Sequence, residues 1–211
     1  MVIHILNLLF PITCVSCHKH GEYICDPCKQ RLNFIPPSFL ESGKYVDAFY
    51  SPFLFANKAV RELIARLKYR RIRPIANILG EMIINYLEKY EIQFPKNATI
   101  IPIPLHPHRQ RHRGFNQSEL IAQTISKALD IPLKSHVLEK TNKTRQQVGL
   151  AAVHRRENIK GSFTVPEAAS VTKKTVIVID DVKTTGATIE EAARVLKQAG
   201  ARRIYAITVA H

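Results

Sequence analysis

Apolar positions recur along the chain with the period of helices in some segments and as short continuous runs in others. Amphipathic helices are predicted where the spacing is helical, at 60–67, 75–87, 120–129 and 189–196. Strands are predicted from aromatic or continuous apolar runs at 45–55, 98–104, 135–139, 176–179 and 203–209. Because strands and helices alternate in the second half of the chain, we expect an α/β domain with a mostly parallel sheet flanked by helices.

The first ten residues mix apolar side chains with His4 and Asn7. They lack the basic start and the small-residue cleavage site of a signal peptide, so we interpret them as a short amphipathic helix. No apolar run reaches the roughly eighteen residues that a membrane-spanning helix needs. These features favour a cytoplasmic protein without a membrane span.

The composition is that of an ordinary globular domain with a small appendage, with 211 residues of which 45% are hydrophobic. It excludes a disordered chain, a collagen-like chain and a disulfide scaffold. Lysine and arginine number 31 against 17 acidic residues, which gives a formal net charge of +14. This surplus predicts affinity for anions such as phosphates, nucleic acid or acidic lipid, although basic surfaces also serve solubility alone.

The four cysteines form two Cys-x-x-Cys pairs near the N-terminus, at Cys14, Cys17, Cys25 and Cys28. A two-residue gap lets both thiolates of a pair face one metal ion, and two pairs complete a tetrahedron, so we favour structural zinc. A redox dithiol and adjacent disulfides are the alternatives. His18 and His20, between the pairs, are either substitute ligands or solvated loop residues. A closed four-sulfur site leaves no coordination position open, so such a metal would organise the fold and not catalyse.

The strongest chemical signal is Asp-Asp-Val-Lys-Thr-Thr-Gly-Ala-Thr at 180–188, directly after the apolar run at 176–179. A buried strand there delivers two carboxylates to its C-terminal end, where open α/β sheets bind ligands. The turn that follows is rich in hydroxyls and leads into a helix, whose N-terminus favours a phosphate. The carboxylates suit the hydroxyls of a sugar or a magnesium ion, so the segment indicates a site for a ribose 5-phosphate. Ordinary strand-end charges and a simple helix cap are the alternative reading.

This segment resembles the signature of type I phosphoribosyltransferases, which binds phosphoribosyl pyrophosphate (PRPP) with Mg2+. The resemblance implies that Asp180 and Asp181 are the catalytic pair that holds the ribose hydroxyls. It also implies that the phosphate-binding turn consists of Lys183, Thr184, Thr185, Gly186, Ala187 and Thr188. Some purine-salvage relatives carry a carboxylate in place of Thr184. Because this chain has none there, no general base is identified and turnover stays open.

Two further segments are basic. The predicted strand at 98–104 is followed by an expected loop with three arginines and three histidines. At the same sheet edge, Arg109 and Arg113 can neutralise pyrophosphate, although charge runs are often merely solvated. A long polar stretch at 140–163, which includes Arg145, is expected to be a lid over the pyrophosphate.

Several motifs together resemble the ComF family over nearly the whole chain and in the same order. They are the cysteine pairs after Leu-Leu-Phe-Pro, Leu-Lys-Tyr at 67–69, Arg-Gly-Phe-Asn-Gln at 113–117, Arg and Asn before Gly-x-Phe at 156–163, and the 180–188 segment. The resemblance implies a zinc-knuckle region at 1–40 joined to a phosphoribosyltransferase-like domain at 41–211, with a hood segment at 41–73. It implies a role in natural transformation, handling incoming single-stranded DNA, with a helicase-like ATPase as partner and a place at the inner face of the membrane. The chain has no Gly-x-x-x-x-Gly-Lys-Ser/Thr loop and is not that ATPase itself.

Three functions fit these observations. The first is a competence factor that binds single-stranded DNA and PRPP, with Tyr69, Phe115 or the aromatic residues of the cysteine region stacking on bases unless they pack in the core. The second is a metabolic phosphoribosyltransferase that acts on an unidentified nitrogen acceptor and releases pyrophosphate. The third is a PRPP-sensing module without turnover. Whether the protein is an enzyme, and its oligomeric state, are left open by the sequence.

Overall fold

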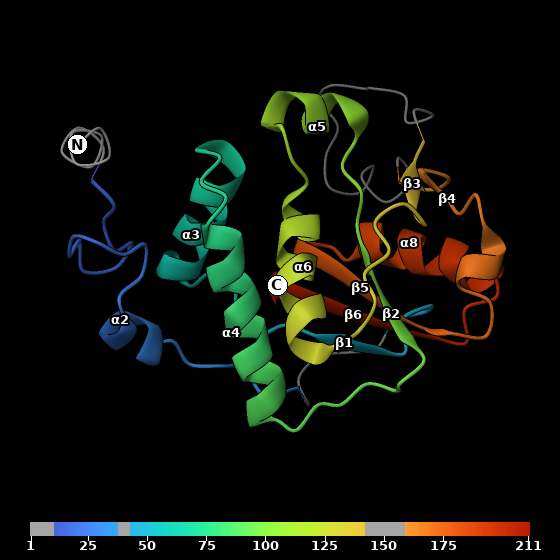
Figure 1. Ribbon diagram of the computed structural model, residues 1–211, viewed down its shortest axis with the longest axis horizontal. Helices are drawn as coiled ribbons and strands as arrows, with labels where there is room; N and C mark the ends of the chain where they lie inside the picture. The colour runs from blue at the N-terminus through green and yellow to red at the C-terminus, as the bar shows by residue number, and fades with distance from the viewer. Residues whose placement is uncertain (1–10, 38–42, 142–158) are drawn as a thin grey trace.

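The computed structural model describes residues 11–37, 43–141 and 159–211. Its centre is a sheet of four parallel strands in the order β1-β6-β5-β2 (Figure 1). The strands are β1 (Ala48–Tyr50), β2 (Ala98–Pro102), β5 (Thr175–Val182) and β6 (Arg203–Ala210). The predicted parallel sheet is therefore confirmed, and β5, which carries the acidic pair, lies in its interior between β6 and β2.

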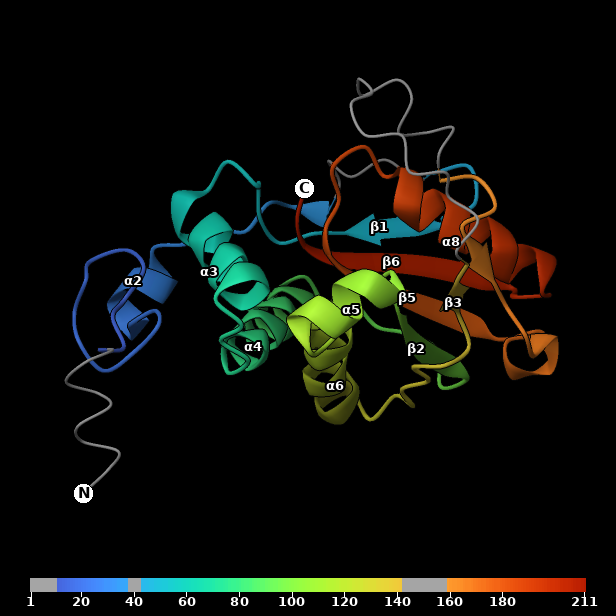
Figure 2. The same cartoon turned by 90° about the horizontal axis from the view of Figure 1, so that it is seen from above.

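Helices cover both faces of the sheet (Figure 2). The helices on one face are α3 (Lys58–Tyr69), α4 (Ile75–Lys89) and α6 (Gln117–Leu129), and α8 (Ala187–Gln198) lies on the other face. Alternate residues of β5 pack into two different hydrophobic clusters, because successive side chains of a strand point to opposite faces. Ile177 and Ile179 pack with α3, α4 and α6, whereas Val176 and Val178 pack with α8.

The cysteine region packs against α3 and α4 at the end of the molecule distant from α8 (Figure 2). It consists of a tight hairpin around residues 12–21 and the short helix α2 (Asp26–Gln30), which begins just after Cys25. Cys14, Cys25 and Cys28 are buried in the same cluster as the apolar faces of α3 and α4. Arg66 of α3 also donates a hydrogen bond of 2.9 Å to the carbonyl of Thr13.

Two local predictions were wrong. The basic loop expected after β2 is the helix α5 (Pro107–Arg113), which begins with a proline in its first turn and ends at left-handed Gly114, yet buries no residue. The strand expected at 135–139 is confined to β3 (Glu139–Lys140), which pairs antiparallel with β4 (Phe163–Thr164) outside the central sheet. The structure also contains a short 3-10 helix, Ala168–Ser170.

The helix expected in the first ten residues and the stretch at 142–158, which contains Arg145, lie outside the described residues. Among the described helices, none has the length and apolar content needed to cross a membrane.

Candidate functional site

Asp180 and Asp181 lie near the C-terminal end of β5, where the N-terminus of α6 also reaches the edge of the sheet. Asp181 is 4% exposed and faces the α3 and α6 side. There it forms an ion pair with Lys68 of α3 and accepts a hydrogen bond of 3.4 Å from the amide of Gln117. Asp180 accepts hydrogen bonds of 2.9 Å from the Ser118 hydroxyl and from the backbone N–H of Asp181.

The two carboxylates lie in different electrostatic environments. Burial and the neighbouring charge of Asp181 raise the pKa of Asp180 to about 7, against the opposing hydrogen bonds from the Asp181 N–H and the Ser118 hydroxyl. Asp181, in contrast, has the ammonium of Lys68 beside it. Asp180 is therefore only partly ionised near neutral pH, and the pair gains most from a ligand that donates hydrogen bonds or brings a cation.

The turn after β5 presents hydroxyls and a helix start. Thr184 and Thr185 are exposed, and the Thr185 hydroxyl accepts a hydrogen bond of 3.4 Å from the Ala187 N–H. Gly186 caps α8 with a φ of 75°, a left-handed conformation that side chains disfavour. Gly186 has no side chain to cap α8, so the first N–H groups of the helix, apart from that of Ala187, are available to an anion.

Cations from three elements lie near the carboxylates. They are Lys68 of α3, described above, Arg113 of α5 and Lys140 of β3. Arg113, the last residue of α5, forms a hydrogen bond with Gln117, the residue that also contacts Asp181. Burial lowers the pKa of Arg113, and the charge of Asp181 opposes that change. On β3, burial and the charge of Arg109 lower the pKa of Lys140, while Asp180 acts in the opposite direction. This environment suits an anionic ligand bound next to the acidic pair.

A cavity of about 420 Å3 borders the turn on the α8 side and not above the carboxylates. Tyr45, Phe49, Lys183 and Glu190 are among its lining residues. The Lys183 ammonium lies 4.2 Å from the centre of the Phe49 ring. The ammonium of Lys183 therefore lies over the Phe49 ring, beside this cavity.

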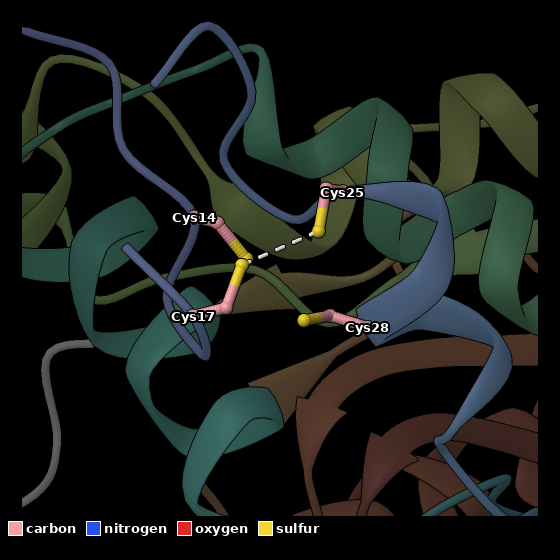
Figure 3. Close-up of side chains that lie close together, drawn as sticks. All are labelled: Cys14, Cys17, Cys25 and Cys28. Carbon is pink, nitrogen blue, oxygen red and sulfur yellow. Dashed lines mark hydrogen bonds between the residues drawn. The ribbon is translucent and has the colours of Figure 1, made fainter. Parts of the chain in front are cut away.

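The four cysteine side chains point toward a common centre (Figure 3). Their sulfur atoms all lie within 4.8 Å of one another, and those of Cys17 and Cys25 are 3.5 Å apart. Burial raises the pKa of Cys14, but N–H donation from the backbone of Cys17 and Cys25 outweighs it and lowers the pKa to about 6. Four sulfurs at this spacing fit a tetrahedral metal ion with Zn–S bonds of about 2.3 Å. The cluster can therefore hold a metal.

Comparison with known proteins agrees with this geometry. The phosphoribosyl transferase domain model matches residues 116–211, which include the acidic pair and the turn. Competence protein F of Haemophilus influenzae is 33% identical over 198 residues, which are 90% of this chain and 81% of that protein. The chain belongs to the competence protein F family.

Other known proteins are similar to this chain over most of its length. DNA utilization protein YhgH of Escherichia coli K12 is 30% identical over 189 residues, 88% of this chain and 76% of that protein. Competence protein ComFC of Streptococcus pneumoniae is 29% identical over 149 residues, 70% of this chain and 61% of that protein.

Solved structures with a similar fold are more distant in sequence. The allosteric regulatory enzyme of purine biosynthesis matches with a TM-score of 0.43 at 18% identity, covering 63% of this chain and 25% of that chain. Adenine phosphoribosyltransferase of Saccharomyces cerevisiae matches with a TM-score of 0.39 at 15% identity, covering 66% of this chain and 71% of that chain. The assignment to the competence protein F family does not depend on either.

The structure brings most of the predicted site residues to one edge of the sheet. Asp180, Asp181 and the turn lie there, and Arg113 is linked to Asp181 through Gln117. Arg109 is exposed on α5 beside Arg113 and Lys140, and Arg145 is outside the described residues.

The sequence analysis placed Lys140 at the start of the expected lid, and Lys68 and Gln117 only within family motifs. It gave no individual role to these three residues or to Ser118. Ser118 could have been found from the sequence, because it comes directly after the Arg-Gly-Phe-Asn-Gln motif and two residues after the predicted helix cap Asn116. No local signal places Lys68 beside a residue so distant along the chain.

We expect Lys68→Met to destabilise the protein by about 1–3 kcal/mol, because it leaves the buried Asp181 carboxylate without its cation. Urea denaturation of the single variants and of Lys68→Met with Asp181→Asn measures the coupling. The double variant should regain most of the loss. Lys197→Met, which breaks the more exposed pair with Asp47, is the matched control and should cost less than about 1 kcal/mol. Equal losses in the two lysine variants would contradict this assignment.

Proposed function

We propose that this protein is a DNA-handling factor of natural transformation that binds PRPP with Mg2+ at the C-terminal edge of its sheet. The observation that carries the proposal is the acidic pair at the end of β5, followed at once by a turn that presents hydroxyls and an uncapped helix N-terminus. The names of its relatives, a competence protein and a DNA utilization protein, support the cellular role.

In this proposal each part of the site meets one part of PRPP. Asp180 and Asp181 accept hydrogen bonds from the ribose hydroxyls and help to hold Mg2+, which would supply charge neutralisation. The 5-phosphate binds to the turn, through the backbone and side chains of Lys183, Thr184, Thr185, Gly186, Ala187 and Thr188. Arg109, Arg113 and, from outside the described residues, Arg145 neutralise the pyrophosphate.

The proposed metal of the cysteine cluster is zinc, held by Cys14, Cys17, Cys25 and Cys28. We further propose a division into a zinc-knuckle region at 1–40 and a phosphoribosyltransferase-like domain at 41–211, with 41–73 as a hood. The contact between Lys68 and Asp181 supports the hood, because it joins α3 to the end of β5.

Isothermal titration with PRPP in the presence of Mg2+ tests the binding site directly. We expect saturable heat from PRPP that is much weaker with ribose 5-phosphate, which lacks the pyrophosphate. Absence of heat with well-folded protein would refute the PRPP site. Release of pyrophosphate in the presence of nucleobases or amines would show turnover, and would then favour a metabolic enzyme over a binding module.

A further inference from the structure

A strip of basic residues runs over the α3–α4 turn and α5, at the upper edge of Figure 1. We call it the basic strip, and define it as Tyr69, Arg70, Arg71, Arg73, Arg109, Arg111 and Arg113. The sequence has no acidic residue between Glu62 and Glu81 or between Glu91 and Glu119, so no carboxylate from either segment offsets these charges. Such a density of uncompensated arginines is the electrostatic signature of a phosphate-binding surface.

The two segments of the strip are joined to each other. Arg73 donates a hydrogen bond of 3.1 Å to the carbonyl of Gly114, and its guanidinium carbon lies 5.2 Å from the centre of the Phe115 ring. Tyr69 lies close enough to Arg113 to influence its pKa. The strip is therefore one continuous surface built from segments that are far apart in the sequence.

Tyr69, within the basic strip, and Phe115, next to it, differ in their exposure. Phe115 is only 8% exposed and packs in the core, so it is not available to a base. Tyr69 is 78% exposed, more than any other large hydrophobic side chain of the described residues. An exposed ring among arginines offers a stacking platform for an unpaired base, which duplex DNA does not present.

The inner end of the strip reaches the proposed PRPP site. Arg113 is hydrogen-bonded to Gln117, which donates to Asp181. Lys68, next to Tyr69 in the chain, is paired with the same carboxylate. An anion on the strip and an anion over the acidic pair would thus both draw on Arg113.

We propose that single-stranded DNA binds along the basic strip with a base stacked on Tyr69, and that it competes with PRPP for Arg113. This inference rests on the proposed function, in which both molecules are ligands of the protein. Because coupling between two ligands is reciprocal, PRPP weakens DNA binding by the same factor as DNA weakens PRPP binding.

Fluorescence anisotropy with a labelled oligothymidine, measured over a range of salt concentrations, tests the location. Arg70→Ala with Arg71→Ala should weaken binding roughly tenfold at low salt and reduce the slope of log K against log salt by about 1.4. Tyr69→Ala should weaken binding about five- to a hundredfold and leave the slope unchanged, because a stacking contact releases no counterions.

The adjacent pair Arg202 and Arg203 provides a matched control, because both are exposed and lie at the opposite, N-terminal end of β6. Arg202→Ala with Arg203→Ala should change the affinity less than twofold. The strip is refuted if this control loses as much affinity as Arg70→Ala with Arg71→Ala, or if Tyr69→Ala binds DNA normally. The alternative is that the strip binds membranes. That would be shown if Arg70 and Arg71 were needed for binding to phosphatidylserine vesicles but not for binding to DNA.

The competition is measured by adding Mg2+ and PRPP to the wild-type complex. We expect the DNA affinity to fall several-fold, and unchanged or stronger binding would refute the competition, provided that titration shows PRPP bound. If the wild type binds no DNA at low salt, the proposed DNA role itself fails while the PRPP site stands. If it binds DNA and the strip variants do not weaken it, only the strip fails.

Discussion

Asparagine at both Asp180 and Asp181 should abolish measurable binding of PRPP with Mg2+ by isothermal titration. Each carboxylate would lose a charge-assisted interaction with the ribose or the metal, and two such losses correspond to about a hundredfold or more in affinity. The acidic pair is held by Lys68, Gln117 and Ser118, and the amide oxygens of asparagine can still accept the last two of these hydrogen bonds. The fold should therefore survive the change.

Asp47→Asn is the control, because Asp47 pairs with Lys197 away from the acidic pair. It should bind PRPP as the wild type does. Retained binding in the variant with both asparagines would contradict the role of the pair.

The single change Asp180→Asn has a second consequence, in stability against pH. The pKa of Asp180 is raised to about 7 in the folded protein, against about 4 in an unfolded chain, so ionisation opposes folding. As the pH rises from 4 to 7, the free energy of unfolding of the wild type falls, because Asp180 ionises more readily in the unfolded chain. Asparagine cannot ionise and does not show this fall. We expect Asp180→Asn to be more stable than the wild type at pH 8, by up to about 4 kcal/mol for a pKa raised by about three units, and to lose that advantage at pH 4. Urea denaturation without PRPP or Mg2+, with the cysteine cluster in the same metal state in both proteins, measures this. A constant difference across pH would contradict the raised pKa.

Removal of the metal from the cysteine cluster should have the largest effect on stability. We expect one zinc per chain by metal analysis. Cys14→Ser should lose the metal and lower Tm by about 10 °C or more, because binding of a structural zinc contributes directly to folding. The loss extends beyond the hairpin, since Cys14, Cys25 and Cys28 share a hydrophobic cluster with α3 and α4.

His18→Ala with His20→Ala is the control, because these residues lie outside the group of four sulfurs. It should keep both the zinc and the Tm. A metal-free wild type that melts at the same temperature as the metal-bound protein would refute the structural role.

Strong periodic patterns in the sequence predicted most of the fold. The continuous apolar run before Asp180 predicts β5, because a parallel strand between two layers of helices is apolar on both faces. The stripe on α8 and the Asn116 cap of α6 were equally readable. The helix α5 was missed because it has no apolar face, although Pro107 and Gly114 mark its two ends.

The site was predictable only where its residues are neighbours in the chain. The acidic pair, the turn and the cysteines are local motifs. For the cysteines, the two-residue spacing within each pair is enough to predict a metal site. The ion pair of Lys68 with Asp181 depends on how α3 packs over the end of β5. Likewise, Tyr69 is exposed and Phe115 is buried in the structure. No local sequence pattern shows which of the two packs in the core and which is free to stack on a base.

Helix α3 makes polar contacts with both the cysteine region and the end of β5. Arg66 holds the backbone of Thr13, the residue before Cys14, and Lys68, two positions later, holds Asp181. The cysteine region and the acidic pair thus each hold a side chain from the last turn of the same helix. Helix α3 is therefore a mechanical link between two regions that are distant in the sequence.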